Sequence, residues 1–110
     1  MSDVVRVAVA GLGTVGAETV RVLRQNADLL TARAGRPIQV VAVSARDRAR
    51  DRGLDLTGID WCDDTMDLAT RDDVDVVAEL IGGSEGIAKD LVEASLQAGK
   101  SVVTANKALV

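Results

Sequence analysis

Residues 4–16 of this 110-residue chain read VVRVAVAGLGTVG, a valine-rich run followed by a glycine-rich hexapeptide. The run from Val4 to Ala10 has the length and composition of a buried parallel strand. The pattern GxGxxG, placed after such a strand and before a helix, is typical of a loop that binds the pyrophosphate of a dinucleotide. We therefore expect this stretch to open an α/β domain that binds a dinucleotide.

Each glycine of the hexapeptide has a physical task in this interpretation. Gly11 permits the tight turn, Gly13 lets the phosphates approach the backbone, and Gly16 lets the helix pack closely on the strand. The free N–H groups and the positive dipole end of the following helix would bind the phosphates. The predicted phosphate-binding residues are Gly11, Leu12, Gly13, Thr14, Val15 and Gly16.

Downstream of this loop, short apolar runs alternate with amphipathic stretches. Apolar or small residues spaced three and four apart predict a helix from Thr14 to about Ala34, with one face that includes Val15, Thr19, Val22 and Leu23. Further strands are predicted at residues 38–43, 59–62, 75–81 and 101–104, and further helices at residues 65–71 and 84–98.

This alternation predicts an open, doubly wound parallel sheet of the Rossmann type with strand order 3-2-1-4-5. We expect residues 1–110 to form one NAD(P)-binding domain. Folds of this kind usually have a sixth strand, so the sheet is expected to be truncated after the fifth strand, with the substrate and dimerisation domain absent.

Composition excludes several classes of function. The net charge of −4 argues against a nucleic-acid partner, because phosphate binding needs clustered basic charge. One cysteine and no histidine argue against a metal site. The chain has no long apolar run and no signal-like N-terminus, so we expect no membrane segment and a cytoplasmic location.

The end of the second predicted strand bears on the choice of cofactor. Domains selective for NAD place an acidic residue there to bind the ribose hydroxyls. This chain instead has Ser44, with Arg46 two residues later, and a guanidinium suits the 2′-phosphate of NADP. Asp47 lies next to Arg46 and complicates this interpretation. NADP is the expected cofactor, and NAD or dual use stays open.

Two further motifs follow the fourth and fifth predicted strands. Gly82 and Gly83 come directly after the fourth strand and would leave room for the nicotinamide ribose. Lys107 follows the fifth strand, at the rim of the expected nicotinamide site. A lysine there could bind a carboxylate or carbonyl substrate, or hold the nicotinamide end of the cofactor.

Three segments together resemble homoserine dehydrogenase: VAVAGLGTVG at residues 7–16, AELIGGSEGIA at 78–88 and GKSVVTANKALV at 99–110. The resemblance covers the whole chain and implies an oxidoreductase that interconverts L-homoserine and L-aspartate 4-semialdehyde with NAD or NADP. That reaction belongs to threonine, isoleucine and methionine biosynthesis. The resemblance also implies a homo-oligomer whose substrate residues lie beyond residue 110, so these residues alone are not expected to catalyse the reaction.

The resemblance assigns roles to individual residues as well. Gly11 to Gly16 would bind the pyrophosphate, and Arg46 would lie near the adenosine ribose or its phosphate. Lys107 would influence hydride transfer electrostatically. The remaining residues expected along the nicotinamide side are Gly82, Gly83, Thr104 and Asn106. Two alternatives are a different amino-acid or semialdehyde dehydrogenase with the same domain, and a stand-alone dinucleotide-binding or redox-sensing module without catalysis.

Overall fold

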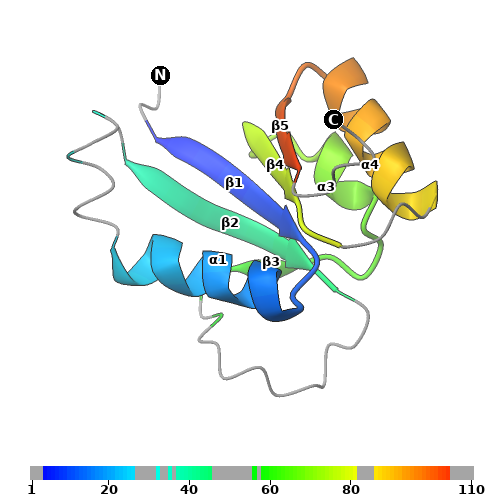
Figure 1. Ribbon diagram of the computed structural model, residues 1–110. Helices are drawn as coiled ribbons and strands as arrows, with labels where there is room; N and C mark the ends of the chain where they lie inside the picture. Colours follow the sequence, from blue (N-terminus) through cyan, green and yellow to red (C-terminus); the bar gives the residue numbers. More distant parts are fainter. Residues whose placement is uncertain are drawn as a thin grey trace.

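The computed structural model describes residues 4–26, 32, 35, 37–45, 56, 58–81 and 86–104. In this part of the chain, five parallel strands form one sheet in the order β3-β2-β1-β4-β5, which confirms the predicted topology (Figure 1). The strands are β1 (Val5–Ala10), β2 (Ile38–Ser44), β3 (Asp60–Trp61), β4 (Val76–Glu79) and β5 (Ser101–Thr104).

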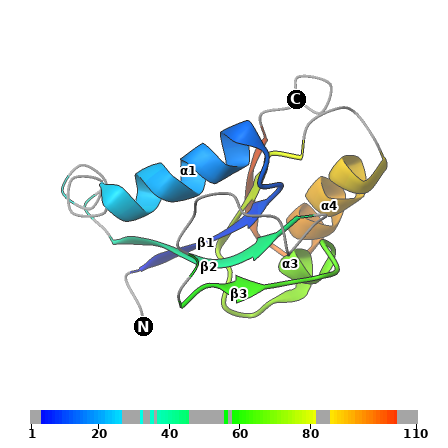
Figure 2. The same ribbon diagram turned by 90° about the horizontal axis from the view of Figure 1, so that it is seen from below.

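Helices cover both faces of the sheet. Figure 2 shows α1 (Thr14–Gln25) on one face, with α3 (Asp67–Thr70) and α4 (Gly86–Gln97) on the other. Burial on both faces explains why the strands are apolar along most of their length. The chain order reverses between β1 and β4, so the carboxyl ends of these two strands form the switch point where ligands of such sheets bind. None of the described helices has the length and apolar character that a membrane span requires.

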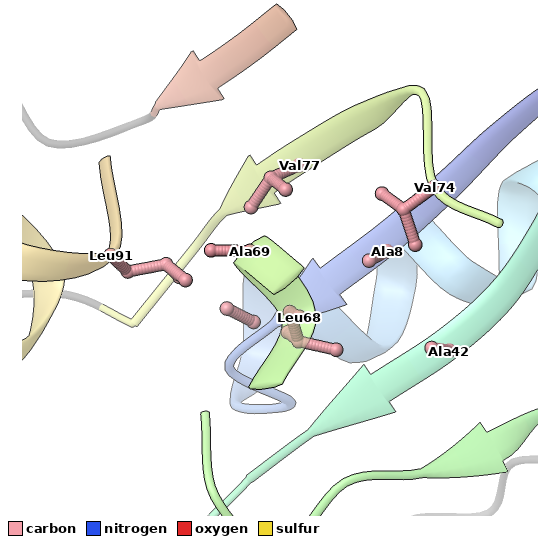
Figure 3. Close-up of a cluster of buried hydrophobic side chains, with 8 residues drawn as sticks. Ala8, Ala42, Leu68, Ala69, Val74, Val77 and Leu91 are labelled. Carbon is pink, nitrogen blue, oxygen red and sulfur yellow. The ribbon is translucent and has the colours of Figure 1, made fainter. Parts of the chain in front are cut away.

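The core under α3 and α4 combines small strand residues with large helix residues (Figure 3). Ala8 and Ala42 are fully buried on the sheet, and their small side chains leave room for Leu68 of α3 and Leu91 of α4. A second cluster lies under α1 and contains mostly valines of the central strands. Both clusters include residues of β1 and β4, so side chains pack against the switch point on both faces of the sheet.

The orientation of α1 differs from the predicted one. Val20 is fully buried and Gly16 also faces the sheet, whereas Val15 is 59% exposed and Val22 is 40% exposed. The close contact between Gly16 and the backbone of Gly11 fixes the rotation of the helix, and apolar spacing alone does not contain that contact. The predicted face is therefore wrong for Val15 and Val22, whereas Leu23 packs against the core as predicted.

The observed ends of helices α1 and α4 agree only in part with the predicted ones. α1 ends at Gln25, and most of the predicted extension to Ala34 lies outside the described residues. α4 ends at Gln97, one residue before the predicted end at residue 98; Gly99 follows with a φ of +81°, and the Lys100 N–H donates to the Ser95 carbonyl at 3.0 Å. The predicted first residue of that helix, Ser84, also lies outside the described residues.

Candidate functional site

The glycine loop follows β1 at the switch point and contacts both neighbouring strands. Gly11 has a φ of +95°, which favours glycine, and its N–H donates to the Ser44 carbonyl at 2.8 Å. A Cβ on Gly11 would lie 2.7 Å from the Leu80 carbonyl oxygen and 2.8 Å from the Ile81 Cα. The loop can therefore close against the segment that follows β4 only because residue 11 is a glycine.

Gly13 and Gly16 have opposite surroundings. A Cβ on Gly16 would lie 1.7 Å from the Gly11 carbonyl oxygen, so the start of α1 packs directly on the loop. A Cβ on Gly13 would meet no atom within 4 Å. Gly13 is also the residue that caps α1, and it supplies no side-chain oxygen to the first helical N–H groups. An open approach to uncapped N–H groups at the positive helix end fits an anionic pyrophosphate.

The other predicted residues of the loop differ in burial. Leu12 is 3% exposed and packs in the cluster under α1, so any contact it makes with a ligand would involve its backbone. Val15 is exposed beside the helix start. Thr14 is the first residue of α1, and its side chain is not described. Their part in phosphate binding stays a prediction.

At the tip of β2, Ser44 is 1% exposed and its Oγ lies 2.8 Å from the Oγ1 of Thr65. The hydroxyl is therefore hydrogen-bonded within the protein, and ribose binding by Ser44 stays a prediction. Sequence reasoning did not single out Thr65, because nothing in the local pattern pairs it with a residue 21 positions away. Arg46 lies outside the described residues.

At the end of β4, Glu79 is fully buried. Its Oε2 accepts a hydrogen bond from the Ile81 N–H at 2.7 Å, and its Oε1 accepts one from the Thr104 hydroxyl at 2.6 Å. Sequence reasoning missed Glu79 as well. The available signal was an acidic residue inside an otherwise apolar strand, since acidic residues are almost never fully buried without partners.

The predicted nicotinamide side is described only in part. Thr104 ends β5 and lies opposite Glu79 in the register of the sheet. Gly82, Gly83, Asn106 and Lys107 lie outside the described residues.

Polar side chains form a row across the last register layer of the sheet. Ser44 pairs with Ala10, Ala10 pairs with Glu79, and Glu79 pairs with Thr104. The glycine loop begins directly after Ala10. The structure thus brings the loop, Ser44 and Thr104 to one edge of the sheet, as predicted, although they lie far apart in the sequence. This edge also carries the open helix end at Gly13, which an extended anionic ligand can approach.

The described residues contain no group of three or more histidine, cysteine, aspartate or glutamate side chains arranged to hold a metal ion. An all-parallel sheet with a glycine-rich loop at its switch point defines a dinucleotide-binding domain of the Rossmann class.

The family follows from comparison with known proteins. Residues 11–110 match the family model described as "Homoserine dehydrogenase, NAD binding domain", and the chain belongs to this family. Homoserine dehydrogenase from Mycobacterium tuberculosis is 44% identical over 106 residues, which are 96% of this chain and 23% of the relative. The chain thus spans about a quarter of the length of the curated relatives that it matches.

Solved structures agree with this assignment. A homoserine dehydrogenase from Thiobacillus denitrificans superposes with a TM-score of 0.86 and is 43% identical, covering 97% of this chain and 24% of that chain. Biliverdin reductase from Synechocystis, solved with biliverdin and NADP⁺, has a TM-score of 0.68 and 27% identity, covering 91% of this chain and 28% of that chain. The predicted family and fold are confirmed, and the family supports a nicotinamide dinucleotide as the cofactor.

Proposed function

We propose that this chain holds the nicotinamide dinucleotide of an enzyme that interconverts L-homoserine and L-aspartate 4-semialdehyde, in threonine, isoleucine and methionine biosynthesis. The observation that carries the proposal is the open, uncapped helix end at Gly13, which lies at the switch point of the sheet. A bound nicotinamide would supply the hydride acceptor or donor for this reaction. The chain's own residues would bind the cofactor and orient it.

The binding roles follow the edge of the sheet. Backbone N–H groups between Gly11 and Gly16 would bind the pyrophosphate, with Gly13 giving the phosphates access. The nicotinamide ribose would lie over Gly82 and Gly83. Thr104, Asn106 and Lys107 would border the nicotinamide ring and the substrate, and Lys107 would act on hydride transfer through its charge.

NADP is the proposed preferred cofactor. The Ser44 hydroxyl is engaged with Thr65, and Ser44 carries no carboxylate with which to repel a 2′-phosphate. Arg46, two residues further on, would then contact that phosphate directly. NAD stays the alternative, because Asp47 adjoins Arg46 and an acidic residue near the tip of β2 suits the hydroxyls of an unphosphorylated ribose.

The remaining features of the proposed enzyme concern regions beyond the described edge. Residues 1–110 would be the NAD(P)-binding domain, and a separate domain would supply the substrate site and the contacts of a homo-oligomer. The cytoplasmic location stays a prediction.

A calorimetric titration of the 110-residue chain with NADP⁺ and NAD⁺ tests the proposal. We expect both cofactors to bind, NADP⁺ more tightly, with no homoserine-dependent reduction of either cofactor by these residues alone. Absence of binding of both cofactors to a folded chain would refute the proposal. Tighter binding of NAD⁺ would refute only the preference for NADP.

A further inference from the structure

Glu79 is fully buried, and both of its carboxylate oxygens are hydrogen-bonded. Its side chain is 0% exposed, and each carboxylate oxygen accepts one hydrogen bond, from the Ile81 N–H and from the Thr104 hydroxyl. The salt bridges found among the described residues do not involve Glu79. Burying a carboxylate costs free energy of folding unless the group is paired or hydrogen-bonded. The two hydrogen bonds to Glu79 offset part of that cost.

The two hydrogen bonds join segments that lie apart in the sequence. Ile81 begins the segment after β4, and Thr104 is the last residue of β5, 25 positions from Glu79. Ile81 also lies close to the glycine loop, because its backbone N and Cα would be 2.8 Å from a Cβ on Gly11. Glu79 therefore connects the end of β5 to the segment after β4, and this segment in turn lies against the glycine loop.

The carboxylate also fixes the direction of the hydrogen bond at Thr104. The Thr104 hydroxyl donates to the Glu79 Oε1, so its proton points toward Glu79. Any further hydrogen bond to the oxygen of that hydroxyl is then one that the oxygen accepts. A ligand group that recognises this oxygen has to be a hydrogen-bond donor, such as the amide N–H of a carboxamide.

We propose that Glu79 is a positioning residue for the nicotinamide half of the cofactor, which it serves by holding Thr104 as a hydrogen-bond acceptor at the end of β5. This inference rests on the proposed function. The two bonds place Thr104 and Ile81 at fixed positions on either side of the expected nicotinamide site. The adenosine half would lie over β2, on the other side of β1, and it does not depend on Glu79.

The test compares each complete dinucleotide with its fragment that lacks nicotinamide. Binding of NAD⁺ is measured against ADP-ribose, and binding of NADP⁺ against 2′-phospho-ADP-ribose. The dissociation constant of the fragment divided by that of the dinucleotide gives the contribution of the nicotinamide end. In Glu79→Gln we expect this ratio to fall by about tenfold, as for the loss of one well-formed hydrogen bond. Binding of the fragments should change by less than about twofold, because the adenosine half keeps its contacts.

The glutamine variant has a specific physical effect. The Ile81 N–H can only donate, so the amide oxygen of Gln would remain with Ile81 and the amide NH₂ would face Thr104. The hydrogen bond at Thr104 would then reverse, and its hydroxyl proton would point away from residue 79. The size of the side chain is kept, and a thermal melt reports whether the variant is folded.

Substitutions of Thr104 provide a second route if Glu79→Gln does not fold. Thr104→Val removes the hydroxyl at nearly constant volume and should lower the ratio as Glu79→Gln does. Thr104→Ser keeps the hydroxyl and should preserve the ratio. Ser95→Ala is the control for stability, because it removes a buried hydrogen bond within α4, to the Leu91 carbonyl, that does not involve Glu79. It should lower the melting temperature and leave the ratio unchanged.

The possible results separate the two proposals. An unchanged ratio in Glu79→Gln and Thr104→Val overturns the role of Glu79 while the proposed function stands. Equal losses for dinucleotides and fragments mean a purely structural role and also overturn it. If the wild-type chain binds no dinucleotide, the proposed function fails and this inference fails with it.

Discussion

At the scale of single residues, we expect alanine substitutions of Gly13 and Gly16, which are three positions apart, to cause different defects. In Gly16→Ala the methyl group would overlap the Gly11 carbonyl, which lies 1.7 Å from the Cβ position. Overpacking of this kind costs about 1–3 kcal/mol, and backbone atoms yield less than side chains. We expect Gly16→Ala to lose at least that much stability in urea unfolding, together with cofactor binding.

Gly13→Ala is the matched variant. The added methyl meets no protein atom within 4 Å, and the φ of −70° at Gly13 is allowed for alanine. We expect a stability change within about 1 kcal/mol and at least a tenfold loss of cofactor affinity, since the methyl would stand where the pyrophosphate approaches. Unchanged affinity in a folded Gly13→Ala chain would contradict the proposed position of the phosphates.

Arg46 provides the test of cofactor choice. If its guanidinium meets the 2′-phosphate, Arg46→Ala should weaken NADP⁺ binding and leave NAD⁺ binding nearly unchanged. A charge-assisted contact of about 1.5–3 kcal/mol corresponds to a loss of roughly ten- to a hundredfold, and solvent exposure favours the lower end. Parallel titrations with both cofactors measure the effect. Equal losses for the two cofactors would instead assign Arg46 to the fold of its loop or to the adenine.

Residues whose role depends on backbone geometry could be predicted from the sequence. The turn at Gly11 and the close packing at Gly16 followed from the motif and its position between a strand and a helix. Glu79 and Thr65 could not be predicted in the same way, because their partners lie 25 and 21 positions away. The strand order was predicted, but these contacts also depend on the register of β4 against β5 and on the position of the turn that carries Thr65, which local patterns do not give.

At the scale of elements, Arg71 connects the turn before β4 to the edge strand β3. Its guanidinium lies 2.8 Å from the carboxylates of both Asp73 and Asp60. The hydrogen bond from Arg71 holds the pKa of Asp73 below its ordinary value, and partial burial opposes this shift. Asp73 therefore stabilises the fold above the pKa of the unfolded chain, and this contribution is lost as the pH falls through the lower pKa of the folded chain.

Asp73→Asn tests this acid dependence. Above about pH 5 the variant should be less stable than the wild-type chain by a constant amount, and below about pH 4 the difference should shrink. The amount should be under about 1 kcal/mol, because the Asp73 side chain is 45% exposed and solvent screens the pair. Urea unfolding over this pH range measures it. Arg71→Gln removes the cation and should abolish the same acid dependence. A difference that persists at low pH would assign the effect to packing.

The strands could be predicted better than the faces of the helices. Valine-rich runs predicted four of the five described strands, and a weaker apolar run at residues 59–62 predicted β3. For α1, apolar periodicity placed Val15 and Val22 inside, and both are exposed. The contact of Gly16 with the glycine loop fixes the rotation of this helix, and a residue without a side chain adds nothing to a hydrophobic pattern.

At the scale of the whole molecule, the edge at β5 is incompletely covered. β5 is the last strand in the sheet of the described residues, and Val103 on it is 59% exposed. Leu96 near the end of the neighbouring helix α4 is 58% exposed. An apolar edge strand invites pairing with another chain. We expect the 110-residue chain to self-associate, with a weight-average mass in sedimentation that rises with concentration.

Val103→Lys is the matched variant for this prediction. A lysine on an edge strand opposes pairing, so the association constant should fall by at least about tenfold. The melting temperature at low concentration should stay nearly the same, because the side chain is already exposed. A clean monomer of the wild-type chain at high concentration would contradict the prediction.

The bare N-terminus of α1 has a consequence for the lifetime of the chain. Gly13 gives the first helical N–H groups no side-chain acceptor, so a bound pyrophosphate would complete the helix as well as occupy the site. A ligand present at a hundred times its dissociation constant stabilises the folded state by about 2.7 kcal/mol. Proteases act mainly on opened chains, and abundance follows the fraction unfolded. The cellular supply of the dinucleotide would then govern how long each copy of this domain survives as well as how much of it is loaded.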